Sequence, residues 1–229
     1  MNILHRDNLP LGGFAGLKEH RVVQDPAVFG AQANADGSWR GSGNFVYLAD
    51  ARFMPHGQTL MHDHHEVDVI SVVVEGRILH EGSFEHGRDL NVNDVQVQSA
   101  GGEGFSHNEI NPDDAWNRMI QIWVLPEEHG KAAKYRVYQP VTGKMTRIYG
   151  GVDNGKADFP AGTRIDVGML AKGQSIKINE PFMAYVTRGS AKANGTAVTD
   201  GDMLRGDMLA LTAGEDVQLI LVSGGKQPK

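Results

Sequence analysis

The strongest constraint on the fold is a pattern of strand, glycine and aspartate that occurs twice in the sequence. An apolar segment ends at Gly76, and Asp94 follows this glycine further along the chain. A second apolar segment ends at Gly189, and Asp207 follows that glycine at the same spacing. The distance along the chain from Gly76 to Gly189 is thus the same as that from Asp94 to Asp207. Internal similarity at a fixed offset indicates a duplicated structural unit.

The segments between the turns have the pattern of short strands. The chain has 29 glycines, together with Asn-Gly and Asp-Gly pairs that are typical of turns. Val95–Gln98 and Met119–Val124 alternate or nearly alternate in polarity, which is the period of a strand. No segment has a long helical period. The sequence therefore predicts an all-β fold of two barrels of one kind, with residues 1–140 in the first and 141–229 in the second.

Composition excludes several classes of function. The chain has no cysteine, so disulfides, thiolate metal sites and thiolate catalysis are excluded, and any metal must use nitrogen and oxygen ligands. The formal net charge is −6 without a run of Lys and Arg, which argues against direct nucleic-acid binding but leaves a protein partner possible. No signal-peptide pattern and no apolar run of about 20 residues is present, so we expect a cytoplasmic protein without a membrane segment.

Two pairs of potential metal ligands lie on predicted strands. His62 and His64 are two residues apart, so on a strand their side chains point to the same face. His107 and Glu109 form a second pair with the same spacing. Two strands that each offer two ligands to one interior can form a four-ligand site for Fe(II), Mn, Co, Ni, Cu or Zn. On an octahedral ion such a site leaves two positions open.

The second barrel lacks this ligand set. Applying the offset between Gly76 and Gly189 to the four predicted ligands gives positions that bind transition metals poorly, and no histidine follows His129. We therefore expect the second barrel to carry no histidine-based site and to have a structural role. The shifted positions are Ser175, Lys177, Ile220 and Val222.

In combination, the motifs resemble those of the pirin family of bicupins. The run His62-Asp63-His64, followed by a strand that ends at Gly76, is similar to the first cupin motif. His107 and Asn111 are similar to the second motif, and the resemblance is strongest from Val46 to Gln139. It implies a bicupin, in which two jelly-roll-type β-barrels lie in tandem.

The resemblance also implies a metal site and an activity. The family's metal is Fe(II), with Ni, Co, Mn, Cu or Zn possible, and the ligands carry over as His62, His64, His107 and Glu109. Some members are similar to quercetin 2,3-dioxygenases, which act on a planar aromatic substrate and O2. They open the heterocyclic ring of a flavonol such as quercetin and release carbon monoxide. Glu109 would then be both a ligand and the base that takes the hydroxyl proton.

Three functions remain open from the sequence. The first is an oxidoreductase that cleaves a flavonol or a similar planar enol with O2. The second is a metal- or redox-responsive regulatory protein of the pirin type, which acts through a protein partner without catalysis. The third is a cupin isomerase or hydrolase that uses the metal as a Lewis acid and consumes no oxygen. Flavonol turnover, oxygen uptake and metal-dependent partner binding discriminate between them.

Two features depart from the family pattern. Cupins usually have a Glu four residues after the second histidine, but here that position holds Asp68, which either orients a ligand imidazole or is solvated. The aromatic N-terminal segment usual in pirins is replaced by Glu19–Val23, and because this segment lies near the pocket mouth in the family, the substrate preference stays open. We expect the following residues at or near the surface: His65, Glu66, His80 and His86.

Overall fold

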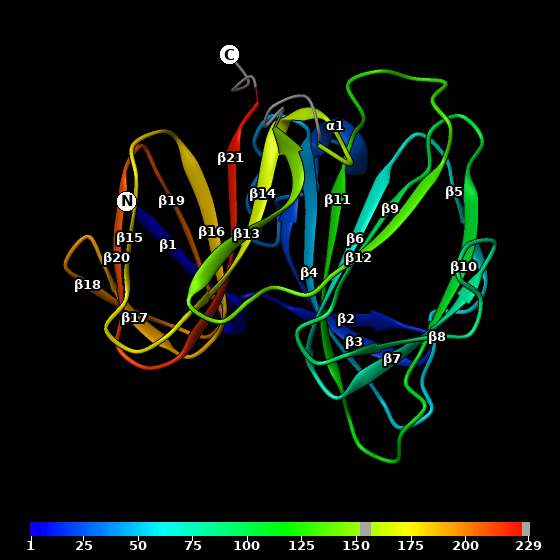
Figure 1. Cartoon of the computed structure of the whole chain (residues 1–229), viewed down its shortest axis with the longest axis horizontal. Helices are drawn as coiled ribbons and strands as arrows, with labels where there is room; N and C mark the ends of the chain where they lie inside the picture. Colours follow the sequence, from blue (N-terminus) through cyan, green and yellow to red (C-terminus); the bar gives the residue numbers. More distant parts are fainter. Residues whose placement is uncertain (152–156, 226–229) are drawn as a thin grey trace. The chain divides into compact units, whose positions relative to one another are not determined.

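The computed structural model describes residues 1–151 and 157–225, which form an almost entirely β structure (Figure 1). They divide into two compact units, one formed by Leu9–Gln139 and the other by Met1–Asn8 with Pro140–Lys229. The all-β prediction is confirmed. In the described ranges, no helix combines the length and the apolar character that crossing a membrane requires.

The first unit consists of two antiparallel sheets. A seven-stranded sheet has the order β12-β9-β6-β11-β4-β3-β2, and a four-stranded sheet has the order β5-β10-β7-β8. One turn of helix, α1 (Pro26–Phe29), follows β3 and is capped by Asp25, whose Oδ1 accepts from the backbone N–H of Ala27 at 2.9 Å. The strands are β2 (Leu11–Phe14), β3 (Leu17–Gln24), β4 (Phe45–Phe53), β5 (His62–His64), β6 (Asp68–Glu75), β7 (Arg77–Gly82), β8 (Arg88–Asn91), β9 (Val95–Ser99), β10 (Phe105–Ile110), β11 (Arg118–Val124) and β12 (Lys134–Tyr138).

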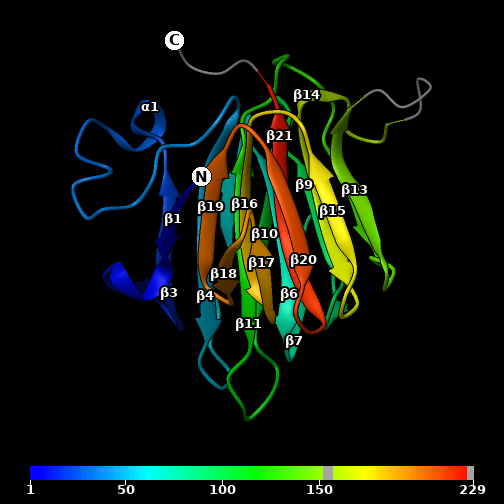
Figure 2. The same cartoon turned by 90° about the vertical axis from the view of Figure 1, so that its left-hand side faces the viewer.

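The second unit also consists of two antiparallel sheets, and Figure 2 shows it with the four-stranded sheet toward the viewer. The larger sheet has the order β1-β19-β16-β21-β14-β13, and the smaller has the order β15-β20-β17-β18. The elements are β1 (Asn2–His5), the 3-10 helix η1 (Arg6–Asn8), β13 (Lys144–Gly151), β14 (Ala161–Leu170), β15 (Ser175–Ile178), β16 (Phe182–Arg188), β17 (Ser190–Ala193), β18 (Thr196–Thr199), β19 (Asp202–Gly206), β20 (Leu209–Ala213) and β21 (Val217–Gly224).

The strand orders show that the two units repeat one topology. The pairings among strands β3 to β11 of the first unit are the same as those among β13 to β21 of the second. Gly76 joins β6 to β7 and Gly189 joins β16 to β17, and both have the positive φ, +68° and +83°, that favours glycine. The predicted duplication therefore has a structural counterpart at these two turns.

The fixed spacing predicted Asp207 as the counterpart of Asp94, but the structure shows that the counterpart is Asp202. Asp94 lies between β8 and β9, where its Oδ2 accepts from the N–H of Asn91 at 2.9 Å. Asp202 begins β19 directly after the turn that follows β18, and its Oδ2 accepts from the N–H of Thr199 at 2.7 Å. The segment from Gly189 to this aspartate is shorter in the second unit, so the constant offset fails beyond the glycine.

The alignment of the two units also changes which residues of the second unit correspond to the predicted ligands. In the first unit His62 faces His107 across β5 and β10. The equivalent strands, β15 and β20, place Ile176 opposite Leu211 and Ile178 opposite Leu209, and all four pack into the apolar core of this unit. The offset between the two glycines therefore does not hold on β15. It selects Ser175 and Lys177, whereas the residues that face inward are Ile176 and Ile178.

Residues 1–8 lie with the second unit, although the sequence pattern placed them in the first barrel. β1 pairs antiparallel with β19, with Ile3 opposite Leu204. In the first unit the equivalent edge, that of β9, is covered by β12. Nothing in the apolar pattern of this short segment distinguishes a strand of one barrel from a strand of the other.

Candidate metal centre

Strands β5 and β10 bring three imidazoles together on the inside of the first unit. His107 lies directly opposite His62, and His64 lies opposite Phe105. The Nε2 atom of His107 is 3.1 Å from Nε2 of His62 and 3.2 Å from Nε2 of His64. Of the residues that the structure describes, only these three histidines form a cluster with metal-ligand geometry, with their ligand atoms all within 4.8 Å of one another.

The hydrogen bonds of the other ring nitrogens determine which atoms face the centre of the cluster. Nδ1 of His62 donates to the carbonyl of Leu60 at 2.8 Å, and Nδ1 of His107 donates to Oε1 of Gln98 at 2.9 Å. In a neutral imidazole the proton at Nδ1 leaves a lone pair at Nε2. Burial lowers the pKa of His64 to about 4 and that of His107 well below its usual value, so both rings are neutral at pH 7.

This arrangement fits a bound cation. The Nε2 lone pairs of His62 and His107, 3.1 Å apart, repel each other unless a positive charge lies between them. Imidazole nitrogens that share an ion at about 2.0–2.1 Å lie about 3 Å apart when they occupy neighbouring positions. Three imidazoles suit a transition metal. The donor set and its spacing therefore match such an ion.

Glu109, the fourth predicted ligand, points into the same interior but lies outside the compact cluster. It follows His107 by two residues on β10 and is fully buried. Its Oε1 accepts from the hydroxyl of Ser71 at 2.6 Å, and its Oε2 is buried without a hydrogen-bond partner. Burial raises the pKa of Glu109 to about 7, and the hydrogen bond from Ser71 opposes that shift. An orphaned buried carboxylate oxygen is unusual in a folded protein, and a cation in this interior would satisfy it.

A buried hydrogen-bond network behind His107 was not predicted from the sequence. Gln98, which accepts from His107, also accepts from the side-chain amide of Gln96 at 2.8 Å. Gln96 in turn accepts from the hydroxyl of Tyr135 at 2.9 Å. The amide of Gln98 donates to Nε2 of His80 at 3.2 Å. These contacts fix the amide orientation of Gln98 and hence the tautomer of His107.

The surface placement predicted for His80 is wrong. His80 is fully buried, and burial lowers its pKa. It lies on β7 next to the turn that suggested exposure, but it points inward like Ile78, two residues before it. Asp68 is also buried, which excludes the solvated alternative. Glu66 is half-buried in a loop, where its Oε1 accepts from the N–H of Gly130 at 2.9 Å.

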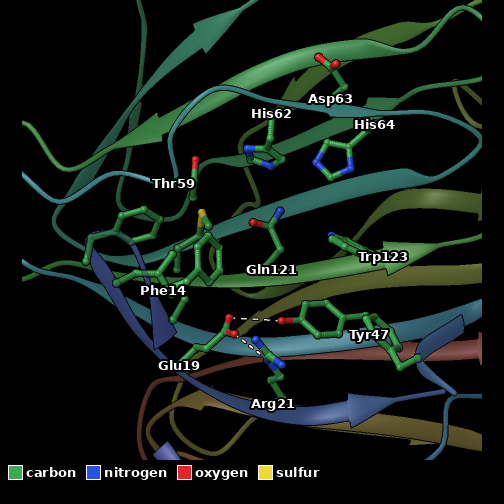
Figure 3. A pocket seen from close by; sticks show the side chains of 15 residues that line it. Phe14, Glu19, Arg21, Tyr47, Thr59, His62, Asp63, His64, Gln121 and Trp123 are labelled. Atoms are coloured by element: carbon green, nitrogen blue, oxygen red, sulfur yellow. Dashed lines mark hydrogen bonds and ion pairs between the residues drawn. The ribbon is translucent and has the colours of Figure 1, made fainter. Parts of the chain in front are cut away.

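A cavity of about 460 Å³ extends from His62 and His64 across the inner face of the seven-stranded sheet (Figure 3). This volume lies in the range of small-molecule sites. The wall opposite the two imidazoles carries three polar side chains in mutual contact, namely Glu19, Arg21 and Tyr47. The lining residues are Phe14, Leu17, Glu19, Arg21, Phe29, Tyr47, Ala51, Phe53, Thr59, His62, Asp63, His64, Met119, Gln121 and Trp123.

Comparisons with known proteins show what this chain is similar to. The family model named Pirin matches residues 32–124. A Zymomonas mobilis protein provisionally named quercetin 2,3-dioxygenase is 26% identical over 77% of this chain and 80% of its own length. The quercetin 2,3-dioxygenase of Escherichia coli K12 is 25% identical over 62% of this chain and 64% of its own length.

A similar solved structure shows the same fold. The crystal structure of an Escherichia coli bacterial pirin in complex with nickel(II) is 16% identical, covers 98% of this chain and 99% of its own, and has a TM-score of 0.82. The predicted bicupin of two jelly-roll-type β-barrels is thereby confirmed. The family match and the shared fold together make this chain similar to the pirin-like bicupins.

Proposed function

We propose that the first unit holds one transition-metal ion on His62, His64, His107 and Glu109, and that the chain is a pirin-type dioxygenase. The substrate would be a flavonol such as quercetin or a similar planar enol, and the co-substrate would be O2. One observation carries the proposal: three imidazoles converge, and two of them, those of His62 and His64, line the end of a largely apolar cavity that is large enough for a small aromatic molecule. The names of the relatives support the reaction class.

The ion proposed here is Fe(II), with nickel, cobalt, manganese, copper or zinc as alternatives. Ligand type alone does not select among these ions, because geometry and availability also decide. The related Escherichia coli pirin was crystallised with nickel(II). Elemental analysis of the protein purified without oxygen is therefore the first part of the test.

The chemistry would be divided between the ion and the side chains of the cavity. A bound divalent ion supplies Lewis acidity toward a substrate oxygen. The aromatic side chains of Phe14, Phe29 and Trp123 line the cavity and would bind a planar ring and exclude water. Glu109 is the proposed base, which would take the hydroxyl proton of the enol at its unpartnered Oε2.

The test combines metal content with turnover. Protein purified without oxygen should contain about one metal ion per chain, and addition of quercetin and O2 should bleach the flavonol absorbance with matching oxygen uptake. His62→Ala should lose most of the metal and the turnover, whereas the control His86→Ala should keep both. Equal metal content in the two variants would show that the ligand assignment is wrong. Metal without turnover would instead favour the regulatory alternative, and turnover without oxygen uptake would favour the isomerase or hydrolase.

A further inference from the structure

The cavity has a polar group at its far end that the proposed chemistry does not use. On β3 the side chains of Leu17, Glu19 and Arg21 occupy alternate positions, and all three line the cavity. Figure 3 shows Arg21 and Glu19 across the cavity from His62 and His64, with Gln121 and Trp123 between the two groups.

The strand register gives the distance between Arg21 and the side of the cavity where the predicted metal ligands lie. Arg21 on β3 is opposite Ala49 on β4, Ala49 is opposite Gln121 on β11, and Gln121 is opposite Ser71 on β6. Neighbouring strands are about 4.8 Å apart, so the Arg21 position is about 14 Å across the sheet from Ser71, which holds Glu109. Arg21 is therefore placed to meet the end of a bound molecule that points away from the imidazoles.

The contacts of Glu19 show which side chain of this wall is accessible to a ligand. The side chain of Glu19 is only 4% exposed, its Oε1 accepts from Nε of Arg21 at 2.7 Å, and its Oε2 accepts from the hydroxyl of Tyr47 at 3.2 Å. Both carboxylate oxygens are thus engaged. The side chain of Arg21 is 46% exposed and lines the cavity, so the guanidinium, which can only donate, is the accessible member of the group.

The ion pair also fixes the guanidinium before any ligand arrives. A buried carboxylate is costly unless it is paired, and Glu19 holds Arg21 through a charge-assisted hydrogen bond that removes much of the freedom of a long side chain. A pre-oriented donor loses less conformational entropy on binding than a mobile one. Arginine is well suited to carboxylate oxygens because its planar N–H groups match their geometry.

We propose that Arg21 is a specificity-determining residue that binds a carboxylate at the end of the substrate remote from His62, His64 and His107. The preferred substrates are then planar aromatic enols that carry an acidic substituent opposite the enol. This inference rests on the proposed function, because it assumes that the substrate reaches from the imidazoles across the cavity. The apolar surfaces of Ala51, Phe53 and Met119 would contact the body of the molecule between its two ends.

Binding without turnover tests the inference. The probes are 3-hydroxyflavone and 3-hydroxyflavone-4′-carboxylic acid, titrated without oxygen into the purified holoprotein and followed by calorimetry. We expect the wild type to bind the carboxylate at least tenfold more tightly than the parent flavonol. Arg21→Gln should abolish this preference. The control Arg52→Gln, which removes an arginine paired with Glu75 instead of one lining the cavity, should keep the preference.

Variants of Glu19 separate recognition from folding. Arg21→Gln leaves Glu19 buried without its cation, so Glu19→Gln/Arg21→Gln provides a neutral pair that should fold and also lack the preference. Glu19→Gln alone keeps an oxygen that can accept from Nε of Arg21 and so orient the guanidinium, and it removes the competing negative charge, so it should bind the acidic flavonol at least as tightly as the wild type does. A merely structural role of Arg21 would not produce this opposite response.

The outcomes distinguish this inference from the proposed function. Equal affinity of the wild type for both probes, or a preference that survives Arg21→Gln, would overturn the role of Arg21 even if both flavonols are turned over. A preference that depends on Arg21, without oxygen-dependent turnover of either probe, would support the subsite and contradict the dioxygenase. If neither probe binds, the subsite and the flavonol substrate both fail.

Discussion

Gln98 is the residue through which the protein sets the orientation of His107. Its amide oxygen accepts from Nδ1 of His107, and its amide nitrogen is committed to His80. Replacement of a residue that orients a ligand in this way typically lowers metal affinity by about 10–100-fold. We therefore expect Gln98→Leu to weaken metal binding by about tenfold or more, as measured by competition with a chelator at fixed pH. Gln98→Glu can still accept from Nδ1 and should recover part of the affinity, and an unchanged affinity in Gln98→Leu would contradict this role.

His64 makes the stability of the metal-free protein depend on pH. Its pKa is about 4 in the folded protein against an ordinary value of 6.5, so between these values the unfolded chain binds more protons than the folded chain. The stability is therefore fully present above pH 6.5 and falls as the pH is lowered toward 4. A difference of two to three units corresponds to roughly 3 kcal/mol. Urea unfolding of the metal-free protein at pH 7.5 and pH 5 should show about 2 kcal/mol of this loss, because pH 5 is still above the folded pKa.

A variant isolates the contribution of that histidine. His64→Leu removes the buried titratable ring, so its loss of stability between pH 7.5 and pH 5 should be smaller than that of the wild type. His107, whose pKa is also lowered by burial, should still contribute. The same pH slope in His64→Leu and in the wild type would show that the acid sensitivity arises elsewhere.

The turn between β6 and β7 requires glycine. Gly76 has φ +68°, and a Cβ added there would lie 2.8 Å from Cβ of Asn117, closer than real contacts allow. At Gly87, φ is +77°, but an added Cβ would meet no atom within 4 Å. Gly76→Ala should therefore cost about 2–3 kcal/mol in the free energy of unfolding and Gly87→Ala about 1 kcal/mol. Equal losses in denaturant titrations would show that the contact with Asn117 is relieved at little cost.

At the scale of elements, the sequence predicted what depends on local pattern and missed what depends on tertiary contacts. Val95–Gln98 lies in β9 and Met119–Val124 lies in β11, as their alternation indicated. His62 and His64 share a face because a strand has a period of two. The inward direction of Gln96 and Gln98 could not be predicted, because alternating Val and Gln usually indicates a polar face in solvent.

At the scale of the whole chain, the duplication was readable but its exact alignment was not. Gly76 and Gly189 mark equivalent turns because both require a positive φ. The equivalence of Asp94 and Asp202 was hidden by a shorter connection, since loops change length more freely than the strands that they join. The family resemblance placed Glu19–Val23 near the pocket mouth, but which side chains of this segment line the cavity depends on the pairing of β3 with β4.

The segment before Leu9 provides the last test, because it contributes an edge strand to the second unit only. β1 covers the edge of β19, the backbone N–H of Arg6 donates to the carbonyl of Gly201 at 2.9 Å, and Nη1 of Arg6 donates to Asp200 at 2.9 Å. Deletion of residues 2–8 should uncover this edge and increase hydrogen exchange of the amides of β19 and β16.

Metal content and flavonol binding should survive that deletion, because all the proposed ligands and cavity residues lie between Phe14 and Trp123. A stable second unit after deletion would show that β1 contributes little to it. A simultaneous loss of metal would show that the first unit depends on this strand, which would contradict the division of the chain into two compact units, each with its own core.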